Sequence, residues 1–190
     1  MTLTPQPDQP IEYLSPALTA TADLADAENV EVVTEKLQGR QRRICAKIHI
    51  PQSLEQVWRV LTDYEHLSDF IPNLSKSVRL AAPEGKIRLE QIGTQCFLNI
   101  QFCARVVLDM EENYPNELGF SMVEGDFKSF RGCWRLVPAD EAEGANHTYL
   151  CYELTVQPPL AMPVALIEKH IRHNLIQNLT AIRQQAIALA

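Results

Sequence analysis

The clearest hydrophobic pattern in this sequence runs from residue 98 to residue 110. Apolar and polar residues alternate there with a period of two, and Val107 is the apolar exception on the polar face. Successive side chains of a β-strand point to opposite faces of its sheet, so the alternation predicts a long strand with one buried face. The apolar face comprises Leu98, Ile100, Phe102, Ala104, Val106, Leu108 and Met110.

Shorter strand-like segments lie on both sides of this long strand. Residues 30–50 contain two of them around Gly39, and the second alternates isoleucine and alanine with other residues from Ile44 to Ile50. The short, turn-rich links between later segments predict an antiparallel meander. These later segments are residues 74–82, 86–95, 114–125, 126–138 and 147–158.

Two short helices and one long helix complete the pattern. Ser53 lies three residues before Gln56, which is the spacing of a helix-capping box. A second short helix is expected to end before Pro72, because proline disfavours helical backbone at the residue before it. After Pro163 an apolar stripe with helical spacing continues for about 25 residues, or roughly 37 Å. The stripe comprises Val164, Ile167, Ile171, Leu175, Leu179, Ile182 and Ala186.

This order of elements predicts an α+β fold. The sheet has one apolar face and the long helix has one apolar stripe, so each can bury its surface against the other. A strongly curved antiparallel sheet wrapped around a long C-terminal helix can leave a space between the two. Apolar side chains with few polar groups would line such a space, which is the usual composition of a small-molecule pocket.

The acidic charge is concentrated at the N-terminus. The chain has 190 residues and a formal net charge of -7, and residues 1–36 contain seven acidic residues and one lysine, which leaves the rest of the chain at about -1. Four prolines and little apolar periodicity in residues 1–29 predict a flexible acidic tail, followed by one folded domain at residues 30–190. No nucleic-acid partner is expected of such an acidic chain.

Targeting and metal signals are weak. No signal-peptide pattern occurs, and no stretch reaches the about 18 consecutive apolar residues of a membrane span, so a cytoplasmic protein is expected. The five cysteines include no CxxC pair, which favours reduced thiols over a zinc site. His170 and His173 lie three residues apart on the long helix, but no third ligand is evident, and we interpret them as surface histidines. Neither a metal nor a cofactor is expected.

Several stretches resemble a known superfamily. The sequence VWRVLTDYEHLSDFIPNLSKS resembles the helix pair of the polyketide cyclase/dehydrase and lipid transport branch of the START-like (SRPBCC) superfamily. The segments ARVVLD, EGDFKSFRGCWRL and YELTV resemble later strands of coenzyme-Q-binding START domains. The overall similarity is to cyanobacterial and plastid members of this branch. It implies a helix-grip fold and a carrier or chaperone for a hydrophobic small molecule, such as a lipid, an isoprenoid or a quinone.

The resemblance and the alternating strands together predict where a ligand would bind. The inward faces of the strands and the apolar stripe of the long helix would line the cavity, although core packing alone also explains each residue. A transient membrane contact would fit such a carrier, and nothing in the sequence indicates an oligomeric state. The expected ligand-binding residues are Ile100, Phe102, Ala104, Phe120, Met122, Trp134, Tyr152, Leu154, Ile167 and Ile171.

The first alternative is an enzyme. Aromatase/cyclases of the superfamily direct enolate chemistry with polar groups inside the cavity, and this requires acid or base side chains that face inward. Glu90 and Gln91 are adjacent, so alternation would point one of them inward, and Gly93 leaves open which one. Tyr152 is a further inward candidate. No catalytic residue is assigned on this basis.

The second alternative is a protein-interaction module. Bacterial members of the branch are linked to ribosome association, and three arginines in four residues, Arg40, Arg42 and Arg43, would be the place for such a contact. The simpler interpretation is a solvated strand end.

The segment EGDFKSFRGCWRL has two unlike faces when it is read as a strand. Phe130 and Trp134 share the face of Gly132, while Arg131 and Arg135 lie on the opposite face. The arginines therefore do not interleave with the aromatic residues, as a base-stacking surface would require. Gly132 predicts a place where the sheet bends, or where a ligand or the helix approaches closely.

Overall fold

The structure is a computed structural model that describes residues 30–97, 100–139 and 146–190. The expected tail at residues 1–29 lies outside the described residues, as do the side chains at 95–97, 100–102 and 166.

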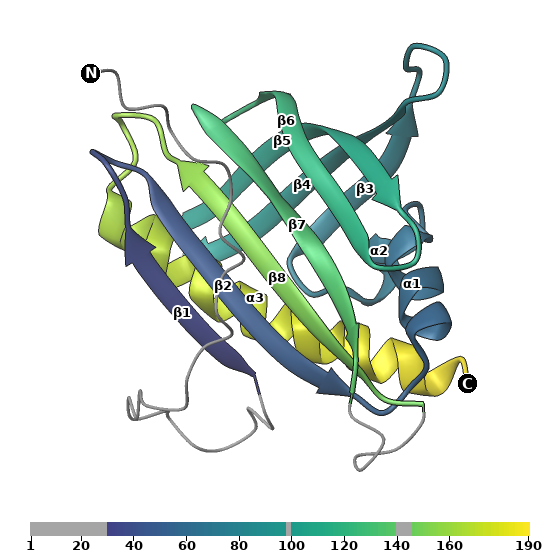
Figure 1. Cartoon of the computed structure of the whole chain (residues 1–190). Helices are drawn as coiled ribbons and strands as arrows, with labels where there is room; N and C mark the ends of the chain where they lie inside the picture. Colours follow the sequence, from purple (N-terminus) through teal and green to yellow (C-terminus); the bar gives the residue numbers. More distant parts are fainter. Residues whose placement is uncertain (1–29, 98–99, 140–145) are drawn as a thin grey trace, which may run out of the picture.

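One eight-stranded antiparallel sheet forms the body of the protein, with the strand order β1-β2-β8-β7-β6-β5-β4-β3. Figure 1 shows the sheet curving around the long helix α3, with the short helices α1 and α2 at one end. The predicted α+β arrangement is therefore confirmed. The elements are β1 (Glu31–Lys36), β2 (Arg42–Ile50), α1 (Leu54–Thr62), α2 (Leu67–Phe70), β3 (Leu74–Leu80), β4 (Ile87–Phe97), β5 (Ile100–Asn113), β6 (Glu117–Gly125), β7 (Ser129–Pro138), β8 (Thr148–Gln157) and α3 (Val164–Ala188).

The strands from β3 to β8 follow one another as the predicted meander, whereas β2 pairs with the last strand. In this pairing Ile44 lies opposite Leu154, and Ile48 lies opposite Leu150. All four side chains are at most 1% exposed. Burying a side chain of this size contributes about 1.5–3 kcal/mol, so this pairing carries a large part of the core.

Local sequence accounts for the short helices. The backbone N–H of Gln56 donates to Ser53 Oγ at 3.3 Å, as the capping spacing predicts. Helix α2 ends at Phe70, and the capping residue Ile71 has an extended backbone with ψ 114°, as the residue before Pro72 requires. Asn73 follows with φ 64°, a left-handed conformation that asparagine tolerates better than most residues.

Helix α3 has 25 residues, in agreement with the length expected from its apolar stripe. Leu179 and Ile182 are fully buried on that stripe. The arginines that precede and begin β2 bind to α3 and to the segment before it. Arg40 donates to the carbonyls of Pro159 and Met162, and Arg42 Nε donates to Glu168 Oε2 at 3.0 Å.

Arg43 also has a partner within the chain. Its Nη2 donates to Glu153 Oε2 at 2.9 Å across the β2–β8 pair. The expected solvated strand end is therefore wrong, because Arg42 and Arg43 are mostly buried and all three guanidinium groups bind intramolecular acceptors.

Candidate ligand-binding cavity

A cavity of about 270 Å³ lies between the concave face of the sheet and α3. The first wall comes from β4 and β5. Ala104, Val106, Leu108 and Met110 line it at every second position of β5, as the alternation predicts. Leu89, Gln91 and Gly93 form the matching row on β4.

The second wall is aromatic and comes from β6, β7 and β8. The rings of Phe120 and Tyr152 are stacked with centroids 5.8 Å apart and an interplanar angle of 16°. The ring centroids of Trp134 and Tyr152 are 4.3 Å apart, and those of Phe130 and Phe120 are 5.7 Å apart. All four residues line the cavity, together with Phe127. We call this wall, made of Phe120, Phe127, Phe130, Trp134 and Tyr152, the aromatic end.

Gly132 allows this wall to form. A Cβ atom at Gly132 would lie 2.7 Å from Phe120 Cζ and 1.9 Å from the carbonyl oxygen of Glu153, so no side chain fits. The predicted close approach is present, but the approaching groups are the Phe120 ring and the neighbouring β8 backbone. The predicted faces of β7 are confirmed, since Phe130 and Trp134 line the cavity while Arg135 pairs with Glu117 outside it.

Helix α3 and the short helices close the cavity. Ile167, Ile171 and Leu175 project from α3, one turn apart. Five apolar or aromatic residues that sequence analysis missed come from the helix pair and its exit: Leu61, Tyr64, Leu67, Ile71 and Leu74. Which face of these short helices and of their connecting turns meets the sheet depends on the tertiary fold, so local spacing does not identify these residues.

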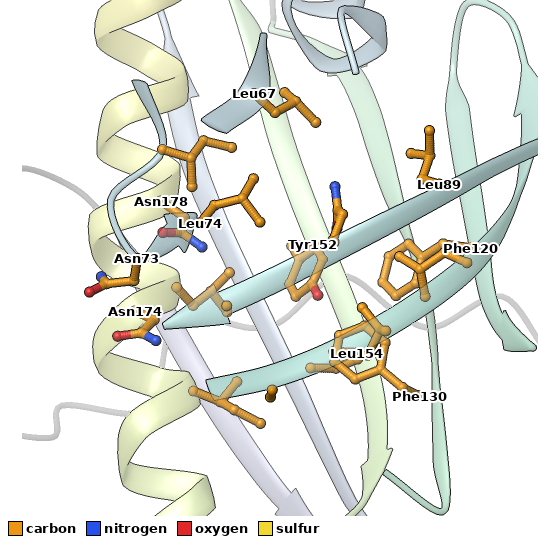
Figure 2. Close-up of a pocket in the computed structure, with 18 of the residues that line it drawn as sticks. Leu67, Asn73, Leu74, Leu89, Phe120, Phe130, Tyr152, Leu154, Asn174 and Asn178 are labelled. Carbon is orange, nitrogen blue, oxygen red and sulfur yellow. The ribbon is translucent and has the colours of Figure 1, made fainter. Parts of the chain in front are cut away.

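The rim beside α3 is polar. Asn73, His170, Asn174 and Asn178 line it, and Figure 2 shows the three asparagines close to the helix. The Asn73 amide donates from Nδ2 to Gln177 Oε1 at 3.0 Å and links the turn before β3 to α3. These residues were also missed, although 170, 174 and 178 repeat every four residues beside Ile167, Ile171 and Leu175, and this spacing places them near the same face.

A second link fastens the same turn to α3. When its amide nitrogen faces the carbonyls, Asn178 donates to Pro72 O at 3.0 Å and to Asn174 O at 3.1 Å. The turn at Pro72 and Asn73 is thus fixed to the helix by side-chain amides rather than by apolar packing alone.

Seven of the ten predicted ligand-binding residues line the cavity. Met122 packs against the core beside Gly125 but is absent from the lining formed by the described residues. The side chains of Ile100 and Phe102 lie outside the described residues. The seven are Ala104, Phe120, Trp134, Tyr152, Leu154, Ile167 and Ile171.

Glu90 and Gln91 take opposite faces. Glu90 lies on the outer face, where it accepts from Lys76 Nζ and from Arg105 Nε, the latter at 2.6 Å. These hydrogen bonds hold the pKa of the Glu90 carboxyl below its ordinary value. Gln91 lines the cavity and donates from Nε2 to Ser77 Oγ at 3.2 Å. Glu90 is therefore excluded as an inward acid or base.

The tyrosines of the lining are neutral phenols. Burial is the main cause that raises the pKa of both Tyr64 and Tyr152 well above the ordinary range. Tyr64 donates from its hydroxyl to Glu112 Oε1 at 2.6 Å. Among the described residues, no aspartate or glutamate lines the cavity.

His170 and His173 lie in different environments. His173 is exposed, but His170 lines the cavity, so the interpretation of both as surface residues is wrong for His170. Desolvation, followed by the charges of Lys169 and His173, lowers the pKa of His170. The described residues contain no group of three or more histidine, cysteine or acidic side chains placed to hold a metal ion.

A curved antiparallel sheet that grips one long helix over an apolar cavity defines the helix-grip class. The sequence profile of the family described as polyketide cyclase/dehydrase and lipid transport matches residues 50–183. The chain belongs to this family, and the START-like fold expected from its motifs is confirmed. No protein of curated function matches the chain in sequence.

Solved structures share the fold. A STAR-related lipid transfer protein from Xanthomonas axonopodis has 16% identity and a TM-score of 0.67, with 86% of this chain and 96% of that chain covered. The Zhui aromatase/cyclase from Streptomyces has 16% identity and a TM-score of 0.62, with 77% and 93% covered. A START superfamily protein from Mycobacterium smegmatis has 18% identity and a TM-score of 0.63, with 78% and 99% covered.

The description of the family covers both polyketide cyclase/dehydrase chemistry and lipid transport. In the described part of the chain, no helix is both long and apolar enough to cross a membrane.

Proposed function

We propose that this protein binds a hydrophobic small molecule, such as a lipid, an isoprenoid or a quinone, in the cavity between sheet and α3, and acts as its carrier or chaperone. One observation carries the proposal: apolar and aromatic side chains line most of the cavity, and most of its polar side chains lie at the α3 rim, with Gln91 and the Tyr152 hydroxyl as exceptions. Such a lining favours transfer of an apolar chain from water into the protein.

The energetics permit useful affinity. Burying one methylene group contributes about 0.8 kcal/mol, so three isoprene units of about five carbons each would contribute roughly 12 kcal/mol. The lower bound of the association cost, about 4 kcal/mol before the ligand chain is ordered, would leave roughly 8 kcal/mol, which corresponds to a micromolar Kd. Ala104 and Val106 on the sheet, with Ile171 and Leu175 on α3, are the proposed contacts for the aliphatic part.

Cyclase or dehydrase chemistry has less support. The Tyr64 hydroxyl is engaged by Glu112, and Glu90 points away from the cavity, so the remaining candidates are His170 on the α3 rim and Tyr152 at the aromatic end. An enolate reaction needs both an inward base and an inward donor near one substrate carbon.

A ribosome contact through Arg40, Arg42 and Arg43 also has less support, because each guanidinium group already binds an acceptor within the chain.

The test is to extract the purified protein with organic solvent and identify the extracted molecules by mass spectrometry. A recurrent lipid or quinone at close to one molecule per chain would support the carrier. A protein that yields no such molecule and also fails to bind a panel of lipids and prenyl compounds would contradict it. Turnover of a polyketide-like substrate would instead favour the enzyme.

A further inference from the structure

The aromatic end contains one hydroxyl whose hydrogen-bonding capacity is unused. Within the described part of the chain, the Tyr152 hydroxyl makes no hydrogen bond, whereas the other lining tyrosine, Tyr64, donates to Glu112. Tyr152 is only 9% exposed, and Figure 2 shows it among the side chains that line the cavity. A hydroxyl that faces an apolar cavity without a partner in the protein favours a ligand that supplies one.

The orientation of the Tyr152 ring is fixed by its neighbours. Phe120 stacks on it from β6, and Trp134 lies beside it from β7, directly opposite in the strand register. Gly132 removes the side chain that would otherwise displace Phe120. Three adjacent strands therefore hold the phenol in one place, and the hydroxyl is preorganised rather than free to seek another acceptor.

The Tyr152 hydroxyl can act only as a neutral hydrogen-bond partner at physiological pH. Burial raises its pKa well above the ordinary range, so the proton stays on the oxygen. A phenol in this state donates to a carbonyl or ether oxygen, and a pure hydrocarbon would leave it unsatisfied. The aromatic side chains around it favour a flat ring, since aromatic rings pack well in offset-stacked and edge-to-face arrangements.

We propose that the aromatic end is a recognition site for a planar ring that carries an acceptor oxygen, with Tyr152 donating to that oxygen. The ring enters first and packs against Phe120 and Trp134, and the aliphatic part of the ligand extends toward α3 and its asparagine rim. This proposal rests on the proposed function and narrows it to a class of ligand: aryl ketones, quinones and aryl ethers with an aliphatic substituent.

Two matched probes test the proposal: 2-hexanoylnaphthalene, an aryl ketone, and 2-hexylnaphthalene, which lacks the oxygen. Their Kd values are measured by titration calorimetry for the wild-type chain and for Tyr152→Phe, which keeps the ring and removes the hydroxyl. The expected result is a three- to tenfold loss of affinity for the ketone in Tyr152→Phe, with unchanged or tighter binding of the hydrocarbon. Tyr149→Phe is the control, because Tyr149 lies on the same strand but packs beside His49 outside the cavity, and it should change neither Kd.

A second readout reports the hydrogen bond directly. The carbonyl stretching frequency of the bound ketone should be lower in the wild-type chain than in Tyr152→Phe, while the melting temperatures of the two proteins show that both are folded. Equal effects of Tyr152→Phe on both probes, or an unchanged carbonyl frequency, would overturn the proposal. If neither naphthalene probe binds but solvent extraction yields an aliphatic lipid, the ring site is wrong while the carrier function stands.

Discussion

Glu90 and Gln91 are neighbours on β4 whose side chains leave the sheet on opposite faces. The carboxylate of Glu90 is held outside by Lys76 and Arg105, and the amide of Gln91 lines the cavity beside Leu89. This arrangement decides the chemistry of the β4 wall, because the neutral amide of Gln91 faces the cavity and the charged carboxylate of Glu90 faces away from it. A wall of this kind suits an apolar ligand better than proton transfer.

Glu90→Gln should leave ligand affinity unchanged and alter the acid sensitivity of folding. The pKa of Glu90 is lowered in the folded protein, so its contribution to stability is present above the unfolded pKa of about 4.3 and is lost as pH falls through the folded value. The wild-type chain should therefore lose more melting temperature than Glu90→Gln between pH 6 and pH 3. Thermal melts across this range, with probe titrations at pH 7, check both parts. A large loss of affinity in Glu90→Gln would contradict the outward placement.

Gly132→Ala should destabilise the protein strongly. The new Cβ would meet the carbonyl oxygen of Glu153 and the ring of Phe120, and forced overpacking costs about 1–3 kcal/mol or more. Gly119→Ala is the matched control on the adjacent strand, because its Cβ would make an ordinary contact 3.6 Å from Glu111 Cβ. Urea unfolding of the three proteins measures the difference. Equal stability of the two variants would show that the close approach at Gly132 is absent.

We expect the ligand to leave past the turn at Pro72 and Asn73, so Gln177→Ala should speed ligand exchange. The change removes the hydrogen bond from Asn73 that ties the turn before β3 to α3, and a neutral hydrogen bond contributes about 0.5–1.5 kcal/mol. The dissociation rate of a bound fluorescent lipid should rise roughly two- to tenfold in stopped-flow displacement. Gln184→Ala, at an exposed position of the same helix, should leave the rate unchanged. An unchanged rate in Gln177→Ala would place the exit elsewhere.

Periodicity predicted the parts of the site that lie on long regular elements. The alternation of β5 placed Ala104 on the inner face, and the stripe of α3 placed Ile167 and Ile171 against the sheet. These assignments succeed because the side-chain period of a strand or helix is fixed by backbone geometry. The sequence left open whether Glu90 or Gln91 faces inward, because a glycine at position 93 can shift the alternation of a strand. In the structure Leu89, Gln91 and Gly93 all line the cavity, so the alternation of β4 is unbroken there.

Periodicity could not predict contacts between distant segments. Ile44 pairs with Leu154 because the first strands join the end of the meander, and no local pattern encodes that partner. The asparagine rim depends in the same way on where Asn73 meets α3. Arg42 looked like a solvated residue because its partner Glu168 lies 126 positions away.

The central claim is that the cavity itself holds the ligand, and a pair of substitutions on adjacent residues of β5 tests it most directly. Ala104 faces the cavity and Cys103 is exposed on the opposite face, so Ala104→Phe fills the cavity while Cys103→Phe adds the same ring outside. Titration with farnesol by calorimetry should give one site per chain for the wild-type chain and for Cys103→Phe. Ala104→Phe should bind at least tenfold more weakly, with a melting temperature that shows the protein is folded. Equal binding by all three proteins, or no binding of farnesol or any other lipophilic probe by the wild-type chain, would contradict the account.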